Sequence, residues 1–322
     1  MKTPQDGRSR HAMRYALMLR TMAMCLWFPA AAAFSAYSDL VVFGDSLSDT
    51  GILFSKIGQP PSPPYYAGRA SNGPLAVEYL ASSLNAGLTN FAEGGATTGL
   101  TNIYDPGGSV GLVGMLSEVN NYQSTVSTAD PTALYILWGG ADDFANITGL
   151  GAGQNAATTA ANNLAGEVST LASLGAKNFL VPNLPDLALI PWVSSQGSAA
   201  MFLAHAITLD FNGKLANALA DVRSQTNANI IAFDTFLAVN AVVANPSGFG
   251  FTNVTDSCLS VSLVPCANPD QYLFWDQNHP TTYAHQLLGD QFAATVVPLP
   301  AAIWLFGSGL LGLIGVARRK TI

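Results

Sequence analysis

Ser46, Asp276 and His279 have side chains that could act together as a nucleophile, an orienting acid and a base, although Ser46 lies far from the other two in the chain. Ser46 lies in "VVFGDSLSDTG", where an apolar run ends at a glycine, and "YLFWDQNHPTT" holds Asp276 and His279. A serine hydroxyl is a poor nucleophile until a base takes its proton. Because Asp276 precedes His279 by three residues, its carboxylate can orient one ring nitrogen and leave the other for Ser46. The alternative is an ordinary turn around Ser46 and a turn with a helix cap at Asp276.

The other three histidines are weaker candidates for the base. His11 lies in the basic N-terminal region, and His205 and His285 lie in helix-like apolar stretches, where a core or surface histidine is expected. His279 differs because it follows an aromatic-rich run and precedes a proline that is expected to start a helix.

Five apolar segments rich in β-branched and aromatic residues recur along the chain. They are mostly continuous rather than alternating, as strands buried on both faces are. Helix-like stretches separate them, which predicts a parallel sheet covered on both sides, an α/β/α sandwich in one domain over residues 37–296. The expected strands are 39–45, 88–95, 133–140, 177–185 and 228–234, and the expected helices are 73–84, 111–126, 155–175, 198–225 and 281–297.

The predicted sheet places Ser46 where chemistry is expected. Ligands of such sheets bind at the carboxyl ends of the strands. With Asp39 to Phe43 as the first strand and Gly44 as the turn, Ser46 comes just after a strand end and faces a crevice.

Four ordered blocks of the sequence resemble the GDSL, or SGNH, family of serine hydrolases. They are "FGDSLSDTG", "NFAEGGATT", "WGGADDF" and "FWDQNHPT", and the resemblance covers about residues 39–296. The last block and its surroundings are similar to the secreted bacterial lipase, esterase and phospholipase branch. The resemblance implies a flavodoxin-like three-layer fold and ester hydrolysis through an acyl-enzyme, and we expect no cofactor. No CxxC motif or Cys/His cluster in the sequence suggests a metal site.

The resemblance also assigns roles residue by residue. Ser46 is expected to be the nucleophile, His279 the general base and acid, and Asp276 the orienting carboxylate. The oxyanion hole is expected to consist of the backbone N–H groups of Ser46 and Gly95 and of a side chain at Asp142. A missing side chain at Gly95 would let the backbone approach the substrate closely; the alternative is a simple turn glycine beside Gly94.

Asp142 departs from the family pattern, which usually has asparagine here. An ionised carboxylate only accepts hydrogen bonds and would repel an oxyanion. Three interpretations remain open: Asp142 is protonated in an apolar site and donates, it turns away and leaves a slower enzyme, or the chain is a surface protein that has lost most catalysis. Asp143 fits the usual aspartate of the block and is expected to be structural.

Four other residues follow or flank the nucleophile in the sequence. Asp45 and Asp49 flank Ser46 and are expected to organise the loop rather than catalyse. Tyr65 and Tyr66 lie in "FSKIGQPPSPPYYAGRA" and either line an acyl or sugar site or pack the loop down.

The N-terminus has the order of a secretory signal peptide. Five basic residues precede the apolar run "TMAMCLWFPAAAAF", and small residues follow. Residues 1–36 are therefore expected to be removed during export, with translation starting at Met1 or Met13. A membrane anchor or a buried helix is the alternative.

The C-terminal segment, residues 297–322, has an uncharged apolar part, residues 299–317, that is long enough to span a bilayer, and a basic cluster follows it. With its proline-rich start, its "WLFGSGLLGLIG" middle and its basic end, the segment resembles the PEP-CTERM sorting signal of Gram-negative bacteria. Leu299 stands where the signal usually has glutamate. The resemblance implies transient inner-membrane anchoring, an exosortase-type processing partner, and delivery to the cell surface or extracellular matrix; a permanent tail anchor is the alternative.

Charge and cysteine content agree with an exported protein that does not bind nucleic acid. Without the two terminal segments, 5 Lys and Arg remain against 19 Asp and Glu, a net charge near −14. Such a surface repels phosphate backbones. Cys258 and Cys266 are the only cysteines left, and in an oxidising compartment they are expected to form a disulfide, two free buried thiols being the alternative.

The sequence therefore predicts an exported serine esterase or lipase that hydrolyses carboxylic esters, such as lipids or lysophospholipids, through Ser46. The runner-up function is an acetylesterase acting on extracellular polysaccharide. A weakly catalytic or non-catalytic surface protein is the rival class, which Asp142 favours and the intact Ser46, Asp276 and His279 oppose.

Overall fold

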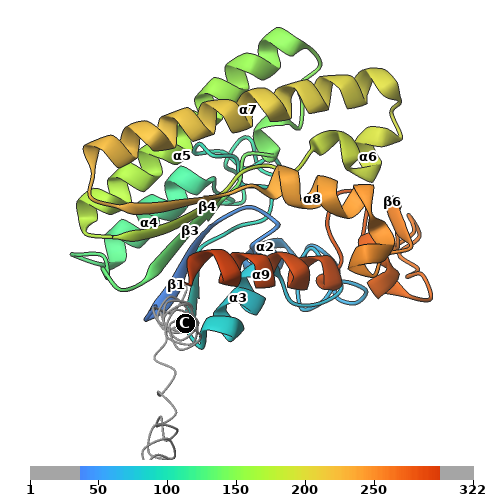
Figure 1. The fold of residues 1–322 in the computed structure, drawn as a ribbon, viewed down its shortest axis with the longest axis horizontal. Coiled ribbons are helices and arrows are strands. Elements are labelled where there is room, and N and C mark those ends of the chain that lie inside the picture. Colours follow the sequence, from blue (N-terminus) through green and yellow to red (C-terminus); the bar gives the residue numbers. More distant parts are fainter. Residues whose placement is uncertain (1–36, 298–322) are drawn as a thin grey trace, which may run out of the picture. The chain divides into compact units, whose positions relative to one another are not determined.

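A five-stranded parallel sheet lies at the centre of residues 37–297, the part of the chain that the computed structural model describes (Figure 1). The strand order is β2-β1-β3-β4-β5, which is the flavodoxin-like order. The expected three-layer α/β/α fold is thereby confirmed. The strands are β1 (Asp39–Gly44), β2 (Gly87–Asn90), β3 (Leu134–Trp138), β4 (Asn178–Pro182) and β5 (Asn229–Phe233).

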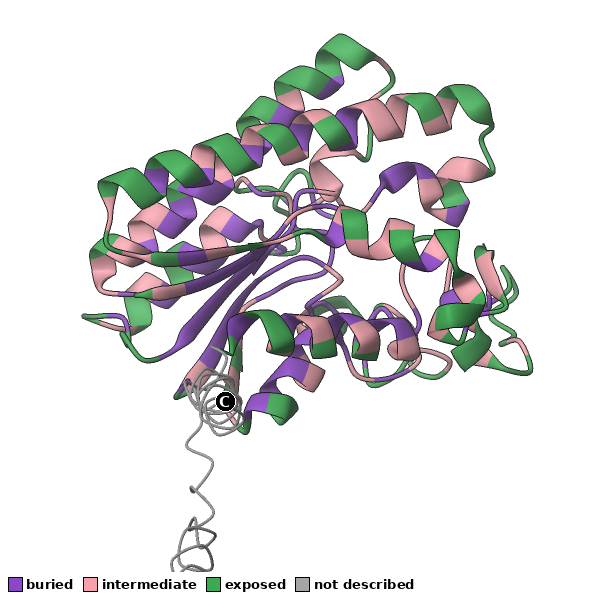
Figure 2. Cartoon of the chain, in the orientation of Figure 1, coloured by how far each residue is buried: buried purple, intermediate pink, exposed green. Residues whose placement is uncertain are grey.

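Helices cover both faces of the sheet. One face packs against α4 (Met115–Thr125), α5 (Leu150–Leu174) and α7 (Ser198–Gln225), and the other against α3 (Ala76–Leu84) and α9 (Thr282–Val296). Figure 2 shows the buried residues concentrated in the strands and on the sides of the helices that face them. The remaining helices are α2 (Ile52–Ile57), α6 (Pro191–Ser194) and α8 (Thr235–Ala244).

The central strands explain the continuous apolar runs in the sequence. In β1, Val41 and Phe43 belong to one core, and Leu40 and Val42 belong to the core on the opposite face. The expectation of burial on both faces is wrong for the edge strands. Strand β2 has no buried residue, and in β5 only Ile230 is buried; both are edge strands of the sheet.

Several boundaries differ from those expected. Helix α7 has the expected bounds, whereas α5 begins at Leu150 and the expected strand 88–95 ends at Asn90. Gly44 is the last residue of β1 rather than a turn, and α9 begins two residues after Pro280. A Cβ atom at Gly44 would lie 2.3 Å from the Trp138 carbonyl oxygen, so only glycine lets β1 approach β3 this closely.

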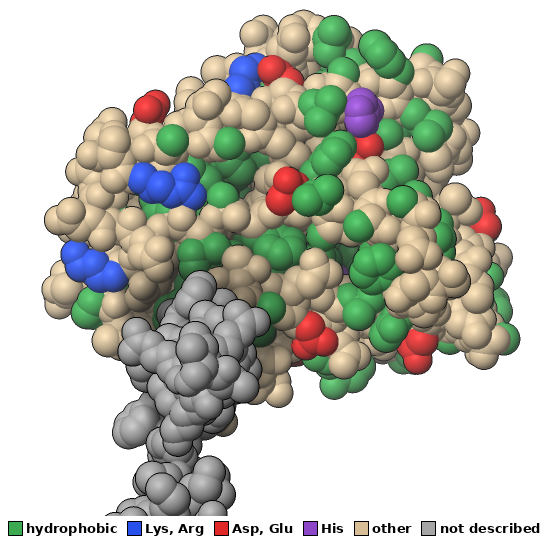
Figure 3. Space-filling model, viewed as in Figure 1, with side chains coloured by type: hydrophobic (Ala, Val, Ile, Leu, Met, Phe, Trp, Pro, Cys, Tyr) green, Lys and Arg blue, Asp and Glu red, His purple; other side chains and the backbone are tan. Residues whose placement is uncertain are grey.

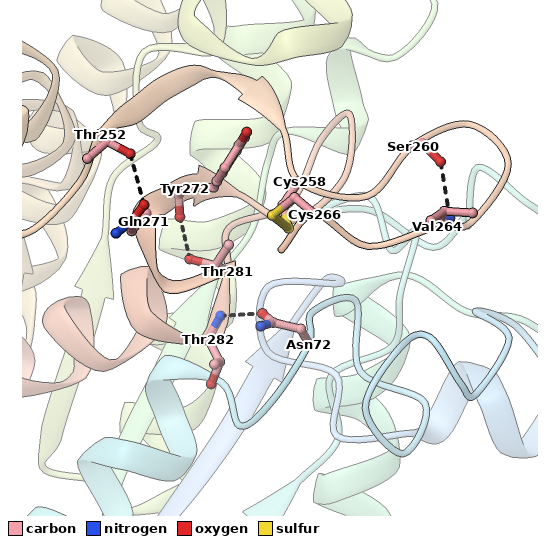
Figure 4. The surroundings of a disulfide bond; sticks show 10 residues. All are labelled: Asn72, Thr252, Cys258, Ser260, Val264, Cys266, Gln271, Tyr272, Thr281 and Thr282. Carbon is pink, nitrogen blue, oxygen red and sulfur yellow. Dashed lines mark hydrogen bonds between the residues drawn. A yellow bond between two sulfur atoms is a disulfide. The ribbon is translucent and has the colours of Figure 1, made fainter. Parts of the chain in front are cut away.

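A second, two-stranded parallel sheet leads to the Asp276–His279 segment. Strands β6 (Asn253–Ser257) and β7 (Tyr272–Phe274) pair, and the Cys258–Cys266 disulfide follows β6 (Figure 4). The backbone N–H of Cys258 donates to the Phe274 carbonyl at 3.0 Å, and that of Leu259 donates to the Trp275 carbonyl at 2.6 Å. The disulfide-closed loop therefore holds the strand from which Asp276 and His279 extend.

No helix within residues 37–297 is long and apolar enough to cross a membrane. The expected signal peptide and the apolar segment 299–317 lie outside the described residues.

Removal of the disulfide by the double substitution Cys258→Ser and Cys266→Ser is expected to lower the free energy of unfolding by about 2 kcal/mol. The reason is that a cross-link over a short loop restricts the unfolded chain. Urea unfolding of the oxidised full chain and of the variant measures the difference. The reduced wild type is the control and should match the variant; equal stability of the oxidised and substituted proteins would contradict the expectation.

Candidate active site

Ser46 lies in the loop that leaves the carboxyl end of β1 and points its hydroxyl at His279. The Ser46 Oγ is 2.8 Å from the His279 Nε2. The backbone N–H groups of Ser48 and Asp49 both donate to the Asp45 carbonyl, which closes a tight turn around Ser46. Two segments separated by 233 residues thus meet at hydrogen-bonding distance.

Asp276 holds the other side of the imidazole. Both carboxylate oxygens of Asp276 lie 2.9 Å from the His279 Nδ1. The Asp276 Oδ1 also accepts the backbone N–H groups of Asn278 at 2.8 Å and His279 at 2.7 Å. The backbone N–H of Trp275 donates to the His279 carbonyl at 2.7 Å, so the loop is short and closed. Ser46, His279 and Asp276 form a continuous hydrogen-bonded chain.

Tyr65 donates a further hydrogen bond to Asp276. Its hydroxyl donates to the Asp276 Oδ2 at 2.7 Å, and its ring packs edge-on against Trp275. Burial and the charge of Asp276 raise the pKa of Tyr65, so the hydroxyl keeps its proton and donates. Tyr65 therefore neither lines an acyl site nor merely packs the loop; it supports the carboxylate. Tyr66 is exposed and lies under the Arg69 guanidinium.

The charges around His279 favour its protonated form. Burial alone would lower the pKa of His279, but Asp276, followed by Asp142 and Asp45, outweighs burial and raises it above the ordinary value. Burial would likewise raise the pKa of Asp276, but His279 and the hydrogen bonds to the carboxylate lower it. The imidazole can thus take up a proton while Asp276 stays ionised, which suits a general base.

Gly95 lies in the loop after β2 with a backbone conformation that favours glycine. Its φ is 83°, and a Cβ atom would lie 2.5 Å from the Tyr104 ring and 2.6 Å from the Asn102 side-chain oxygen. Positive φ and the lack of space both require glycine here. The backbone N–H of Gly95 remains a predicted oxyanion donor.

Asp142 lies after β3 and lines the same cavity as Ser46 and His279. No described residue donates a hydrogen bond to its carboxyl group. Burial raises the pKa of Asp142 well above its ordinary value, and Asp45 raises it further, whereas His279 opposes the shift. Burial also raises the pKa of Asp45 to about 6. The backbone N–H of Leu47, which donates to the Asp45 carboxylate at 3.0 Å, lowers this pKa and so opposes the effect of burial.

Two other acids hold loops rather than face the cavity. Asp49 accepts the backbone N–H groups of Gly51, Ile52 and Leu53 at the start of α2 and that of Gly94 after β2. Asp143 accepts both the backbone N–H of Thr98 at 2.9 Å and the Thr98 hydroxyl at 2.8 Å. Both contacts are structural, as expected from the sequence for these two residues.

A large apolar cavity begins at Ser46 and His279. Its volume is about 590 Å³, which is within the range of small-molecule sites. Tyr104 and Trp192 line it and are half exposed, while Val242, Phe251 and Leu288 line it and are buried. Apolar residues of α6, α7, α8 and α9 and of the loops between the strands and helices also line it. The sequence carried no local signal for this cavity, because these elements meet only in the tertiary fold.

The remaining described histidines are outside the Ser46 cluster. His285 is fully buried in α9, and its Nδ1 accepts the backbone N–H of Ala76 at 3.3 Å. His205 in α7 is half exposed and lies 2.7 Å from the Asp186 carboxylate. They occupy the core and surface positions expected of them.

The family model for GDSL-like lipase/acylhydrolase matches residues 40–292. The chain belongs to this family. It is an ester-hydrolysing enzyme.

The chain is also similar to individual proteins of known name. It is 30% identical, over 85% of its length, to the phosphatidylcholine-sterol acyltransferase of Aeromonas hydrophila, of which 94% is covered. It is 28% identical, over 78% of its length, to the thermolabile hemolysin of Vibrio parahaemolyticus, of which only 62% is covered. A solved lipolytic protein of the G-D-S-L family from Veillonella parvula has a TM-score of 0.44 at 16% identity, with 81% of this chain and 99% of that chain covered.

Substitution of Tyr65 by phenylalanine is expected to lower kcat/KM for ester hydrolysis about tenfold, because the loss of a hydrogen bond to a charged group costs about 1.5 kcal/mol. Steady-state kinetics of the full chain measures the loss. Tyr66→Phe is the matched control and should stay within about twofold of wild type, since a neutral change on an exposed ring touches no carboxylate. Equal kinetics of the two variants would show that Tyr65 does not support Asp276.

Proposed function

We propose that the protein hydrolyses carboxylic esters of lipids through an acyl-enzyme on Ser46. The observation that carries this proposal is the hydrogen-bonded chain from Ser46 through His279 to Asp276 at one end of a large apolar cavity. His279 takes the Ser46 proton as the hydroxyl attacks the ester carbonyl and then donates a proton to the leaving alcohol. Water, activated by the same imidazole, releases the acid.

The expected oxyanion hole follows from the sheet order. Strands β2, β1 and β3 are neighbours, so the loops that carry Gly95, Ser46 and Asp142 leave the same edge of the sheet side by side. The backbone N–H groups of Ser46 and Gly95 supply two donors. Asp142 supplies the third in its protonated form, because a neutral carboxyl group has an O–H to donate. The raised pKa of Asp142 supports this interpretation over an ionised carboxylate that turns away.

The cavity supports a lipid acyl group rather than an acetyl group. An acetyl group would leave most of the roughly 590 Å³ of apolar space unfilled, whereas a longer chain buries apolar surface at about 25 cal/mol per Å². The relative from Aeromonas hydrophila is named for a phospholipid and a sterol, which agrees with a lipid substrate.

The surface charge favours a neutral or zwitterionic substrate. Residues 37–297 carry 5 basic residues, Lys56, Arg69, Lys177, Lys214 and Arg223, against 19 acidic ones, of which 7 are buried and 12 are not. Figure 3 shows uncharged and hydrophobic side chains over most of the face that includes α7 and α8. A strongly anionic ester would be repelled rather than steered to such a surface.

Export is part of the same proposal. The Cys258–Cys266 disulfide supports an oxidising compartment, and the basic-then-apolar N-terminus supports secretion. Processing of the C-terminal segment by an exosortase-type enzyme, and delivery to the cell surface or outside the cell, follow from the resemblance of that segment to a sorting signal.

Hydrolysis of p-nitrophenyl decanoate by the full chain is expected to exceed that of p-nitrophenyl acetate in kcat/KM by about tenfold or more, and Ser46→Ala should abolish both. The reason is that the longer chain fills the apolar cavity. Preference for acetate would favour the polysaccharide acetylesterase, and absence of Ser46-dependent hydrolysis would contradict the proposal.

Ala238 and Ala241 on α8 offer a matched pair for the cavity. Ala238 lines it and Ala241 is exposed on the same helix. Ala238→Phe should therefore reduce decanoate hydrolysis about tenfold and leave acetate hydrolysis nearly unchanged, a penalty of about 1.4 kcal/mol. Ala241→Phe should change neither; equal effects of the two variants would place the acyl chain elsewhere.

The pH profile of kcat/KM is expected to be bell-shaped. The raised pKa of His279 places the acid limb above about 6.5, its ordinary value, because only the neutral imidazole accepts the Ser46 proton. Loss of the Asp142 proton causes the alkaline limb, because the ionised carboxylate no longer donates. Asp142→Asn should remove the alkaline limb and raise the rate about tenfold at about pH 8. An unchanged profile in this variant would exclude Asp142 from the oxyanion hole.

A further inference from the structure

Glu118 is an acid that the fold buries among apolar side chains. It lies in α4 and is 1% exposed, beside Met115, Val119 and Tyr122, which are buried on the same face of the sheet. A carboxyl group in such surroundings is unfavourable unless hydrogen bonds compensate for the lost water. Burial accordingly raises the pKa of Glu118 well above its ordinary value, although the backbone N–H groups that donate to its carboxyl group act to lower it. Packing therefore does not explain why position 118 has an acidic residue.

The two carboxyl oxygens of Glu118 hold two different strand ends. The Oε2 accepts the backbone N–H of Gly44 at 2.9 Å, and the Oε1 accepts the backbone N–H of Glu93 at 3.1 Å. The backbone N–H of Glu93 also donates to the Gly44 carbonyl at 3.0 Å. Gly44 is the last residue of β1, and Glu93 follows the end of β2 by three residues. One side chain therefore links the ends of two adjacent strands.

These are the strand ends that lead to the oxyanion donors. Ser46 follows Gly44 by two residues, and Gly95 follows Glu93 by two residues. The paired registers of β1 and β2 end at Val42 and Asn90. Beyond them the backbone N–H of Phe91 donates to the Val42 carbonyl at 2.8 Å, and that of Glu93 donates to the Gly44 carbonyl. Glu118 adds a side-chain bridge to these two backbone hydrogen bonds at the point where the two loops begin.

We propose that Glu118 is a positioning residue that fixes the backbone N–H groups of Ser46 and Gly95 at the spacing the oxyanion requires. Glu118 touches neither substrate nor the reacting atoms; it acts through Gly44 and Glu93. This inference rests on the proposed acyl-enzyme function of Ser46. It extends that function by naming a residue outside the four resembling blocks, on a helix behind the sheet.

Glu167 offers a matched control. It lies in α5, is equally buried at 1% exposed, and is close enough to raise the pKa of Glu118. Neither of its carboxyl oxygens has a hydrogen-bond partner among the described residues. Glu118 and Glu167 thus place the same chemical group in the same core, and only Glu118 contacts the loop backbones.

The test compares Glu118→Gln with Glu167→Gln in the full chain. The amide of Glu118→Gln has one oxygen, so one of the two backbone N–H groups faces another donor instead of an acceptor. A misplacement of about 1 Å at a reacting centre costs about 10²-fold in rate. Glu118→Gln is expected to lower kcat for a p-nitrophenyl ester by about 10- to 100-fold with KM within about twofold of wild type. Glu167→Gln should leave both constants within about twofold.

Inhibition by an alkyl boronic acid separates positioning from general loss of structure. Its tetrahedral adduct with Ser46 uses the oxyanion hole, whereas ground-state substrate binding depends mainly on the cavity. Glu118→Gln should therefore raise the inhibition constant in proportion to its loss of kcat/KM, as expected for a loss of transition-state binding. Glu118→Asp, which keeps the acid but is too short to reach both N–H groups, should show the same pattern and provides a second variant if the glutamine protein does not fold.

The outcomes are distinct. Wild-type kinetics or an unchanged boronate constant in a folded Glu118 variant would overturn the positioning role while leaving the proposed function intact. Equal losses in Glu118→Gln and Glu167→Gln would also overturn it, since they would reflect removal of a buried acid rather than of the bridge. A wild-type enzyme without Ser46-dependent hydrolysis would overturn the proposed function and the inference together.

Discussion

The close parallel packing of β1 between β2 and β3 is the constraint on which the site depends. At the carboxyl end of β1 the approach to β3 leaves no room for a side chain, and Gly44 meets this requirement. Strands β2 and β3 lie on opposite sides of β1, so the carboxyl end of β1 is at the topological switch point of the sheet. Ligands of such folds bind there. Three loops leave the same edge, and each carries one of the expected oxyanion groups. The fold thus positions these groups before any side-chain contact is considered.

The base arrives from a different part of the chain and needs its own support. His279 extends from a two-stranded sheet that a disulfide-closed loop holds, and its carboxylate partner receives two backbone N–H groups and one tyrosine hydroxyl. These contacts and the charge of His279 lower the pKa of Asp276 and keep it ionised, although burial opposes them. The acids Asp45 and Asp142 lie nearby, and burial raises the pKa of both. The charge of His279 and the hydrogen bonds therefore set Asp276 apart from the other two acids.

Local sequence was sufficient to predict the parallel sheet, the bounds of α7 and the meeting of Ser46, Asp276 and His279, because strand runs, helix lengths and block motifs are short-range signals. Other features depend on contacts between distant segments. Tyr65 reaches Asp276 across 211 positions, and Glu118 joins two strand ends from a helix on one face of the sheet. The edge strands were predicted to be buried because their segments read as apolar runs, whereas the position of a strand at the centre or edge of the sheet is set by pairing between distant segments. The sequence did not predict helices α2 and α8 or the strand pair β6–β7. These elements are short or follow loops, so the hydrophobic pattern does not repeat often enough to indicate a helix or a strand.

The measurement that tests the central claim most directly is mass mapping of the full chain after reaction with a fluorophosphonate. The account predicts one covalent adduct, on the peptide that contains Ser46, and a strong loss of labelling in His279→Ala because the hydroxyl is no longer activated. A folded, ester-hydrolysing enzyme that leaves Ser46 unmodified, or that carries the adduct on another residue, would contradict it.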